Sequence, residues 1–294
     1  AGRPTRDTER ACVAGGCENA DESGRISAGR GQMSVEGRID EALLEEVIGI
    51  ASSAGELTLK WFHGSGLDVR TKQDGTVVTE ADVAAEDLIR SKLRARFPND
   101  GIFGEERGES TGKSGRQWIV DPIDGTVSFV RGVPLYSTLL ALVDDDGPAL
   151  GVICLPALGE TVAAGRGLGA FYNGTPCHVS DTDDLSNALV TASAFDADWW
   201  GSGPLLAIAT SGAQTRTWGD GYGYSLVATG RADAMVEPPV KPWDIAPMLT
   251  IVPEAGGRIT GWHGGPAATN EGGWIVSNSH LHGDLIKCLS DPTR

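Results

Sequence analysis

Apolar residues recur at helical spacing soon after the start of the chain. The positions are Ile39, Leu43, Leu44, Val47, Ile48 and Ala51. They share one face of a helix with 3.6 residues per turn. The same spacing returns over residues 82–97. We therefore expect two amphipathic helices to open the folded part of the chain.

Short apolar runs bounded by turn residues follow, as is typical of buried strands. We expect strands at 118–121, 136–143, 149–155 and 160–164. Beyond residue 186, expected strands at 188–192, 216–218 and 234–237 alternate with helices at 204–212, at 222–229 and from 244, before a strand and helix over 274–289. This order predicts an α/β protein, a layered α/β/α/β/α sandwich.

Three regions are predicted along the chain. Residues 1–34 contain as many Arg as acidic residues and few large apolar side chains. Such a segment cannot bury enough surface to offset the entropy of ordering, so we expect a disordered tail. Residues 35–185 then form an N-terminal α+β half, and residues 186–294 form a C-terminal α/β half.

The charge balance narrows the choice of partners. The chain has 24 Lys and Arg against 40 Asp and Glu, a net charge of −16. Such a field repels nucleic-acid phosphates, which argues against a nucleic-acid partner. No run reaches the ~18 apolar residues of a membrane span, which argues against a membrane partner. The five cysteines are an odd number, and three of them are scattered (Cys154, Cys177 and Cys288), which favours a reduced, cytoplasmic setting. Cys12 and Cys17 lie close together and could pair in an oxidising compartment.

Acidic residues stand at the ends of several expected elements. Asp121 and Asp124 flank a Pro-Ile pair where an expected strand ends. The pair Glu105-Glu106 lies upstream, and Asp244 stands at an expected helix start. Carboxylate oxygens are the ligands that Mg²⁺ prefers, so a cation site is one interpretation. Ordinary roles in turns and helix caps are the other.

Several motifs occur together in one order and spacing. They are Glu105-Glu106, Asp121-Pro-Ile-Asp-Gly-Thr126 followed by Phe129, Trp243-Asp-Ile-Ala246 and Glu254-Ala-Gly-Gly257. In this arrangement the chain resembles the inositol monophosphatase family over about residues 38–290. The resemblance implies the layered fold of these Mg²⁺-dependent, lithium-sensitive phosphatases, and it implies a homodimer.

The resemblance also implies the ligands of two or three Mg²⁺ ions, with Mn²⁺ as the alternative cation. Glu105, Asp121 and the Ile123 carbonyl would hold one ion. Asp121, Asp124 and Asp244 would hold a second, and a third, looser ion would also use Glu105. So many acids at one place would repel one another strongly without cations, which agrees with this assignment.

Further residues are implied for the hydrolysis of a phosphate monoester. Thr126 would orient the attacking water, with Asp82 holding the Thr126 hydroxyl, and Glu105 would act through its ion. The N–H groups of Asp124, Gly125 and Thr126 would point at the phosphate, as free donors at a helix start do. Paired metals activate water directly, so no covalent intermediate is expected.

The segment after residue 215 indicates which ester is bound. Its run Trp218-Gly-Asp-Gly-Tyr-Gly-Tyr224 resembles the histidinol-phosphate phosphatase branch of the family more than the inositol branch. Histidinol phosphate carries an ammonium and an imidazole, which Asp220 and Glu237 would complement. The simpler alternatives are that Asp220 is a turn residue and that Glu237 ends a strand.

We therefore expect an enzyme of histidine biosynthesis that converts histidinol phosphate, a small phosphorylated metabolite, to histidinol. The alternative within the enzyme class is an inositol, sugar or nucleoside monophosphatase. The alternative from another class is a catalytically silent binding protein, which would have no need to keep every ligand residue.

Prolines and histidines near the end of the chain give structural expectations. Pro247 lies in the opening turn of the helix expected from Asp244, where proline is tolerated. Pro253 should bend or end that helix. His280 and His282 are expected on the surface at the start of the last helix.

Overall fold

The computed structural model of the protein describes residues 39–64, 67–72, 75–194, 202–266 and 273–290. All of them lie in the compact unit Ile39–Arg294. The disordered tail predicted over residues 1–34 falls outside the described residues and stays a prediction.

An eight-stranded sheet forms the first layer of strands. Its strands are β3 (Gly101–Gly104), β4 (Gly108–Ser110), β5 (Gln117–Asp124), β6 (Ser137–Asp144), β7 (Gly147–Leu155), β8 (Glu160–Gly165), β9 (Gly169–Tyr172) and β10 (Thr175–Cys177). The order is β10-β9-β8-β7-β6-β5-β3-β4, and of the neighbouring pairs only β3 and β5 run parallel. Its central strands are apolar and buried on both faces. The four strands expected between residues 118 and 164 are confirmed.

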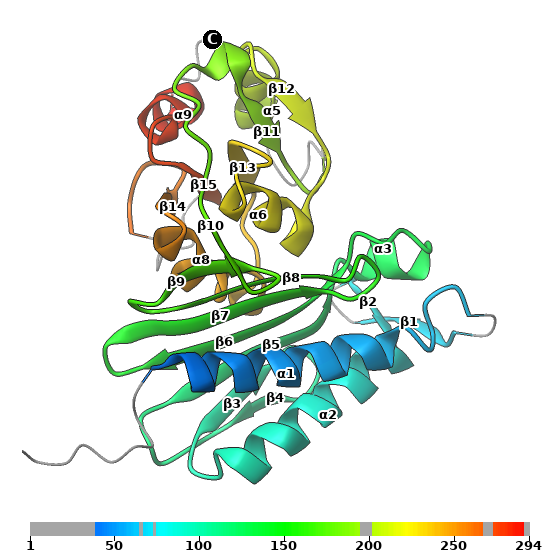
Figure 1. Cartoon of the computed structure of the whole chain (residues 1–294). Coiled ribbons are helices and arrows are strands. Elements are labelled where there is room, and N and C mark those ends of the chain that lie inside the picture. The colour runs from blue at the N-terminus through cyan, green and yellow to red at the C-terminus, as the bar shows by residue number, and fades with distance from the viewer. Residues whose placement is uncertain (1–38, 65–66, 73–74, 195–201, 267–272, 291–294) are drawn as a thin grey trace, which may run out of the picture. The chain divides into compact units, whose positions relative to one another are not determined.

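Two long helices cover one face of this sheet. They are α1 (Glu41–Thr58) and α2 (Glu80–Arg96), which lie side by side (Figure 1). Their apolar faces pack on Trp118 and neighbouring strand residues in one hydrophobic cluster. Each helix begins at a polar cap: the Asp40 carboxylate accepts the N–H of Leu43 at 3.0 Å, and Thr79 caps α2. A small antiparallel pair, β1 (Val69–Thr71) and β2 (Val77–Thr79), leads into α2.

A five-stranded sheet forms the second layer of strands. Its strands are β11 (Leu189–Thr191), β12 (Gln214–Arg216), β13 (Ala234–Glu237), β14 (Gly257–Gly261) and β15 (Trp274–Asn278), in the order β12-β11-β13-β15-β14. β11 runs parallel to β12 and β13, whereas β15 is antiparallel to its two neighbours. The strand expected at 216–218 ends at Arg216, so its predicted position was two residues late.

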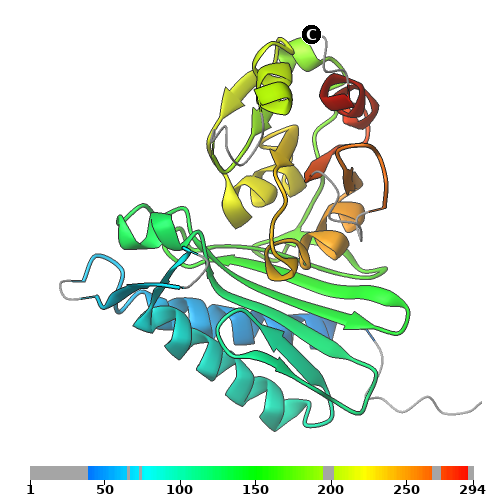
Figure 2. The ribbon, with the colours of Figure 1, turned by 180° about the vertical axis from the view of Figure 1, so that it is seen from behind.

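The remaining long helices complete five layers. α6 (Asp220–Ala228) and α8 (Met248–Glu254) pack between the two sheets, on the face of the first sheet opposite α1 and α2 (Figures 1 and 2). α5 (Ser202–Ala209) and α9 (His282–Ser290) pack on the far face of the second sheet. The predicted α/β/α/β/α sandwich is therefore confirmed.

The two sheets share one hydrophobic core. Ile153 of the first sheet and Met235 of the second lie in the same buried cluster, together with residues of α6 and α8. The chain passes from the first sheet to the second between Cys177 and Leu189. The division into halves at residues 185 and 186 nevertheless stays a prediction, because a common core joins the two sheets.

The helix expected from Asp244 is in fact two helices. α7 (Pro242–Ile245) ends at the residue pair Ala246-Pro247, and Pro247 is the N-cap of α8. Pro247 thus separates two helices instead of lying in one opening turn, because a proline has no N–H to continue the hydrogen-bond ladder. Pro253 lies inside α8, which ends one residue later, as expected.

The surface position expected for His282 is wrong. Its side chain is fully buried, with the two ring nitrogens 2.8 Å from the Ser277 hydroxyl and 2.9 Å from the Thr260 hydroxyl. These two hydroxyls allow the ring to be buried in place of water. Burial lowers the pKa of His282 to about 4, so the ring is neutral. His280 is exposed, as expected.

Candidate active site

The end of β5 places two acidic side chains at one point. Asp121 pairs with Leu139 of β6 and Asp124 pairs with Ser137, so β5 has one extra residue between these two pairs and forms a β-bulge. Pro122 lies in this bulge, where its missing N–H is not needed for the ladder. The Ile123 N–H donates to Asp121 Oδ1 at 3.1 Å and fixes that carboxylate. Both acids are nearly enclosed by protein, with exposed fractions of 2% and 9%.

Asp244 joins these two acids from a distant segment. It lies in α7, where its Oδ2 accepts the Lys241 N–H at 2.9 Å, so it also has the capping role considered for it. One carboxylate oxygen from each of Asp121, Asp124 and Asp244 lies within 4.8 Å of the others. The structure therefore brings together the three acids predicted to share one ion.

Glu105 and Glu106 follow β3, and both form an ion pair with the side chain of Lys72. The Lys72 ammonium lies 2.7 Å from Glu105 Oε1 and 2.6 Å from Glu106 Oε1. Glu105 is outside the group of three acids, but its charge raises the pKa values of Asp121, Asp244 and Asp82. It therefore borders the site, and Lys72 is a neighbour that the sequence analysis missed.

A buried ion pair between Glu86 and Arg90 of α2 supports the turn that follows β3. Glu86 is fully buried and accepts a hydrogen bond of 2.6 Å from Arg90 Nε. Its other oxygen accepts the Glu106 N–H at 2.6 Å. A Cβ atom on Gly104 would lie 2.2 Å from Glu86 Oε1, so only glycine fits there. The position of the two acids after β3 is thus set by α2.

The hydrogen bond expected between Asp82 and Thr126 is not formed. Asp82 Oδ2 accepts the N–H and hydroxyl of Thr79 at 2.8 and 2.6 Å, as the capping box of α2. The Thr126 hydroxyl donates instead to the Ile123 carbonyl at 3.0 Å. Asp82 Oδ1 is buried and has no hydrogen-bond partner among the described residues. Burial raises the pKa of Asp82 to about 6, against the hydrogen bonds from Thr79.

Gly125 and Asp220 pack against each other next to Asp124. Gly125 has φ of 81° and is the N-cap of α3 (Thr126–Val130). A Cβ atom there would lie 2.9 Å from Asp220 Oδ2, so the Asp220 carboxylate packs against this glycine. Asp220 itself has φ of 53°, an uncommon conformation outside glycine, and it opens α6. The next N–H, that of Gly221, donates to Asp124 Oδ2, which the Ser137 hydroxyl also contacts at 3.0 Å.

Ser193 links the two acids predicted to bind the leaving group. Its hydroxyl accepts the Asp220 N–H at 2.8 Å, and its own N–H donates to Glu237 Oε1. Glu237 ends β13 and is only 2% exposed. Ser193 follows the carboxyl end of β11, a parallel strand, which is where α/β proteins place ligand sites. That position is the one signal in the sequence that points to Ser193.

The enclosed acids all have raised pKa values. Burial raises the pKa of Asp121 well above its usual value, and the charges of Glu105, Asp124 and Asp244 add to the effect. Burial, with Asp220 and Asp244, does the same for Asp124. Burial also raises the pKa of Asp244 to about 7 and that of Glu237 to about 8. Without metal ions, the site therefore has more carboxylate groups than the positively charged side chains of the protein neutralise.

Divalent cations fit this arrangement. The carboxylate donors come from the end of β5, from α7 and from the turn after β3, and such oxygen donors are the ones that Mg²⁺ takes together with several waters. Asp121, Asp124 and Asp244 lie close enough to share an ion, and Glu105 stands beside them. Binding a cation would remove the repulsion that raises these pKa values.

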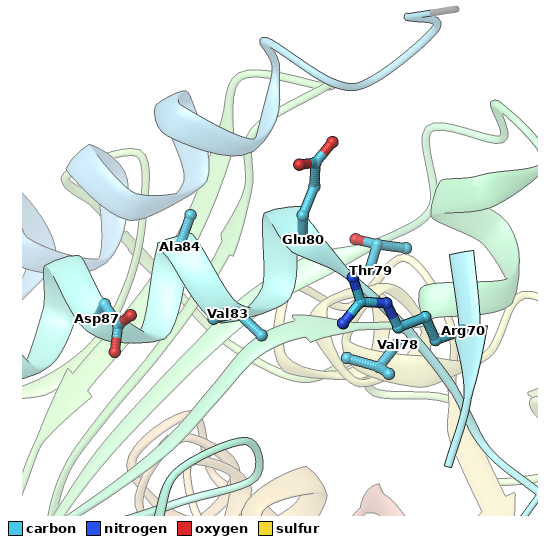
Figure 3. Close-up of a pocket in the computed structure, with 7 residues that line it drawn as sticks. All are labelled: Arg70, Val78, Thr79, Glu80, Val83, Ala84 and Asp87. Atoms are coloured by element: carbon cyan, nitrogen blue, oxygen red, sulfur yellow. The ribbon is translucent and has the colours of Figure 1, made fainter. Parts of the chain in front are cut away.

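Figure 3 shows a pocket at the start of α2. It encloses about 300 Å³ and is lined by Arg70, Val78, Thr79, Glu80, Val83, Ala84 and Asp87. None of the three clustered acids lines it.

Among the described helices, none has both the length and the apolar character that crossing a bilayer requires.

The fold and the site define an α/β sandwich protein that gathers carboxylates for divalent cations. The chain belongs to the inositol monophosphatase family, whose sequence profile matches residues 40–293.

Two curated relatives and one solved structure are close to this chain. Histidinol-phosphatase of Chlorobaculum parvum is 42% identical over 253 residues, which covers 85% of this chain and 98% of the relative. Histidinol-phosphatase of Mycobacterium tuberculosis is 40% identical over 251 residues, 83% of this chain and 96% of the relative. The structure of an IMPase from Thermotoga maritima has a TM-score of 0.78 and 33% identity, covering 85% of this chain and 98% of the other.

Proposed function

We propose that this protein is a Mg²⁺-dependent phosphatase that hydrolyses histidinol phosphate to histidinol. The observation that supports phosphatase chemistry best is the meeting of Asp121, Asp124 and Asp244 within 4.8 Å, beside Glu105. The family and the identity to two histidinol-phosphatases support the substrate. Mn²⁺ is the alternative cation.

The acids divide into two sets of ligands in this proposal. Glu105, Asp121 and the Ile123 carbonyl hold one cation, and Asp121, Asp124 and Asp244 hold another. A third, looser cation would use Glu105 again. When bound, the cations supply Lewis-acid chemistry: they neutralise phosphate charge and lower the pKa of a coordinated water. The enclosing acids keep this chemistry in a largely buried site.

Thr126 and Asp82 position the attacking water. The Thr126 hydroxyl donates to the Ile123 carbonyl at 3.0 Å, and this carbonyl oxygen would also hold a cation. Asp82 Oδ1, buried without a partner among the described residues, is the acceptor available to the Thr126 hydroxyl. Gly125 and Thr126 offer backbone N–H groups to the phosphate, which align the ester for displacement without a covalent intermediate.

Asp220 and Glu237 recognise the leaving group. Glu237 is buried and Asp220 is half-buried, and Ser193 forms a hydrogen bond with each of them. Burial raises the pKa of Asp220 to about 6 and that of Glu237 to about 8. A leaving group with an ammonium and an imidazole would favour the charged forms of these two acids, whereas a neutral polyol would offer them no counter-charge.

Phosphate release from a panel of esters tests the proposal. The panel contains histidinol phosphate, inositol 1-phosphate, a sugar phosphate and a nucleoside monophosphate, each with Mg²⁺ and with EDTA. We expect histidinol phosphate to give the highest kcat/KM, EDTA to abolish release, and Li⁺ to inhibit it. A preference for inositol 1-phosphate would refute the substrate assignment. No hydrolysis of any ester would favour a binding protein.

Assembly and location are further proposals. The family resemblance supports a homodimer. Among the described cysteines, Cys154 and Cys177 are free thiols, which agrees with a cytoplasmic protein.

A further inference from the structure

Ser137 carries a hydroxyl group that has no exposed surface. It begins β6, whose residues from Leu139 to Val143 are all apolar. The hydroxyl donates its one proton to Asp124 Oδ2 at 3.0 Å. Burying a hydroxyl group is costly unless it forms a hydrogen bond. The contact with an acid of the site therefore explains why a serine is suited to this buried position.

The bulge in β5 brings Asp124 to this serine. Asp121 and Asp124 are three residues apart, so in a regular strand their side chains would point to opposite faces of the sheet. The extra residue in the bulge brings both acids to one place, and Asp124 then lies directly opposite Ser137 on the antiparallel strand β6. Directly paired residues have Cβ atoms about 5 Å apart, within reach of a hydrogen bond between side chains. The contact is thus built into the pairing of the two strands.

A second donor, from a distant segment, uses the same oxygen of Asp124. The Gly221 N–H, at the start of α6, also donates to Asp124 Oδ2. A Cβ atom on Gly221 would lie 2.1 Å from Ser137 Oγ, so the two donors are packed against each other beside the acid. Two donors occupy the two lone pairs of Oδ2, which leaves Oδ1 as the oxygen that Asp124 can offer to a cation.

We propose that Ser137 is a positioning residue for cation binding: together with the Gly221 N–H it holds Asp124 by Oδ2, so that Asp124 offers Oδ1 to its cation in a fixed orientation. Ser137 itself touches neither the cation nor the ester. Hydrogen bonds that orient a ligand in this way raise its affinity for a metal ion. Because Gly221 follows Asp220, the same contact joins the cation ligand to the segment assigned to the leaving group. The inference rests on the cation binding in the proposed function and deepens it.

Calorimetric titration of the metal-free protein with Mg²⁺ tests the inference on Ser137→Ala. We expect the dissociation constant for Mg²⁺ to rise about tenfold, since loss of a group that orients a ligand lowers metal affinity by about 10–100-fold. Phosphate release from histidinol phosphate should then need more Mg²⁺, with little change in kcat at saturating Mg²⁺. A serine that served the fold alone would lower the melting temperature in EDTA and leave the dissociation constant unchanged.

A double variant asks whether Ser137 acts through Asp124. In the Asp124→Asn background, Ser137→Ala should change the dissociation constant for Mg²⁺ by less than about twofold, because the carboxylate that the serine orients has been removed. The difference between the two backgrounds measures the coupling between these two residues in cation binding.

Ser225→Ala is the matched control, since it removes a fully buried hydroxyl that donates to the Tyr222 carbonyl at 2.7 Å within α6. It should leave the dissociation constant for Mg²⁺ unchanged. An unchanged constant in Ser137→Ala, an equal rise in Ser225→Ala, or an undiminished effect in the Asp124→Asn background would overturn the inference alone. A wild-type protein that binds Mg²⁺ but hydrolyses no ester would refute the proposed function, and one that binds no Mg²⁺ would refute both.

Discussion

The ammonium group of Lys72 lies 2.7 Å from Glu105 Oε1, an acid that the family resemblance makes a metal ligand. Glu106 Oε1 is 2.6 Å from the same nitrogen. Burial lowers the pKa of Lys72, but the hydrogen bonds to the two glutamates outweigh it and the net pKa is raised, so the side chain stays charged. Lys72 and a divalent cation thus compete for the negative charge of Glu105.

Replacing Lys72 by Met should strengthen cation binding. The competing charge is removed, so we expect the dissociation constant for Mg²⁺ to fall several-fold, about 1 kcal/mol, the scale of a partly exposed ion pair. The metal-free protein should become slightly less stable, because Glu105 and Glu106 lose their counter-charge. Titration calorimetry measures the first effect and thermal unfolding in EDTA the second.

Lys92→Met on the exposed face of α2 serves as the control for Lys72→Met, since it removes an equal charge away from the acids. An unchanged or weaker affinity for Mg²⁺ in Lys72→Met would show that Lys72 does not compete with the cation.

Asp124→Asn should separate activity from folding. The amide oxygen can still accept from the Ser137 hydroxyl and the Gly221 N–H, so the local structure is kept. Turnover should fall by roughly a thousandfold, because a metal ligand loses its charge. The melting temperature in EDTA should not fall, since one of several repelling carboxylates becomes neutral. Phosphate release and thermal unfolding give the two readouts.

Asp87→Asn controls for the loss of a carboxylate at a surface ion pair with Arg107. It should retain turnover. If Asp124→Asn hydrolysed esters as fast as the wild type, the site would be misplaced.

The stability of the metal-free protein should fall as pH rises. The pKa of Asp244 is raised to about 7 and that of Glu237 to about 8, both chiefly by burial, from values near 4 in the unfolded chain. Between these limits the folded state binds more protons than the unfolded state. The free energy of unfolding therefore decreases with pH from about 4 to about 8.

Melting temperatures measured in EDTA between pH 5 and 9 check this dependence. Saturating Mg²⁺ should remove the part of this dependence that comes from Asp244, because this acid is then deprotonated over the whole range both in the cation-bound folded protein and in the unfolded chain. A metal-free stability that rises over this range would mean that other groups dominate. Asp87 and Asp144 are not among them, since their ion pairs lower their pKa values below the range.

The periodic features of the chain could be predicted from its sequence. The apolar spacing located α1 and α2, and the buried runs located the central strands of the first sheet. The meeting of Asp121, Asp124 and Asp244 came from the family motifs, because nothing in the spacing of one chain shows that residues 121 and 244 are neighbours. Local patterns describe local structure, and the site depends on contacts between distant segments.

The features that were missed depend on three-dimensional contacts of single side chains. Lys72 reaches Glu105 across a small hairpin, and Ser193 meets Glu237 from a neighbouring parallel strand. His282 is buried because two hydroxyls happen to match its ring nitrogens. The Thr126 hydroxyl donates to the Ile123 carbonyl, while Asp82 uses one oxygen, Oδ2, in the capping box of α2. None of these contacts has a repeating signal in the sequence.

Gly221→Ala should damage the site through packing. A Cβ atom at this position would lie 2.1 Å from the Ser137 hydroxyl oxygen and 2.9 Å from Asp124 Oδ2, so one of these groups must move. Because a ligand displaced by about 1 Å can lower the rate about a hundredfold, we expect a loss of that order in kcat. The free energy of unfolding should fall by about 1–3 kcal/mol, the usual effect of overpacking.

Gly203→Ala in α5 is the matched control, since no heavy atom lies within 4 Å of its added Cβ. It should raise stability by about 0.5–1 kcal/mol and leave kcat unchanged. Denaturant unfolding and phosphate release distinguish the two variants, and normal activity in Gly221→Ala would show that Asp124 tolerates displacement.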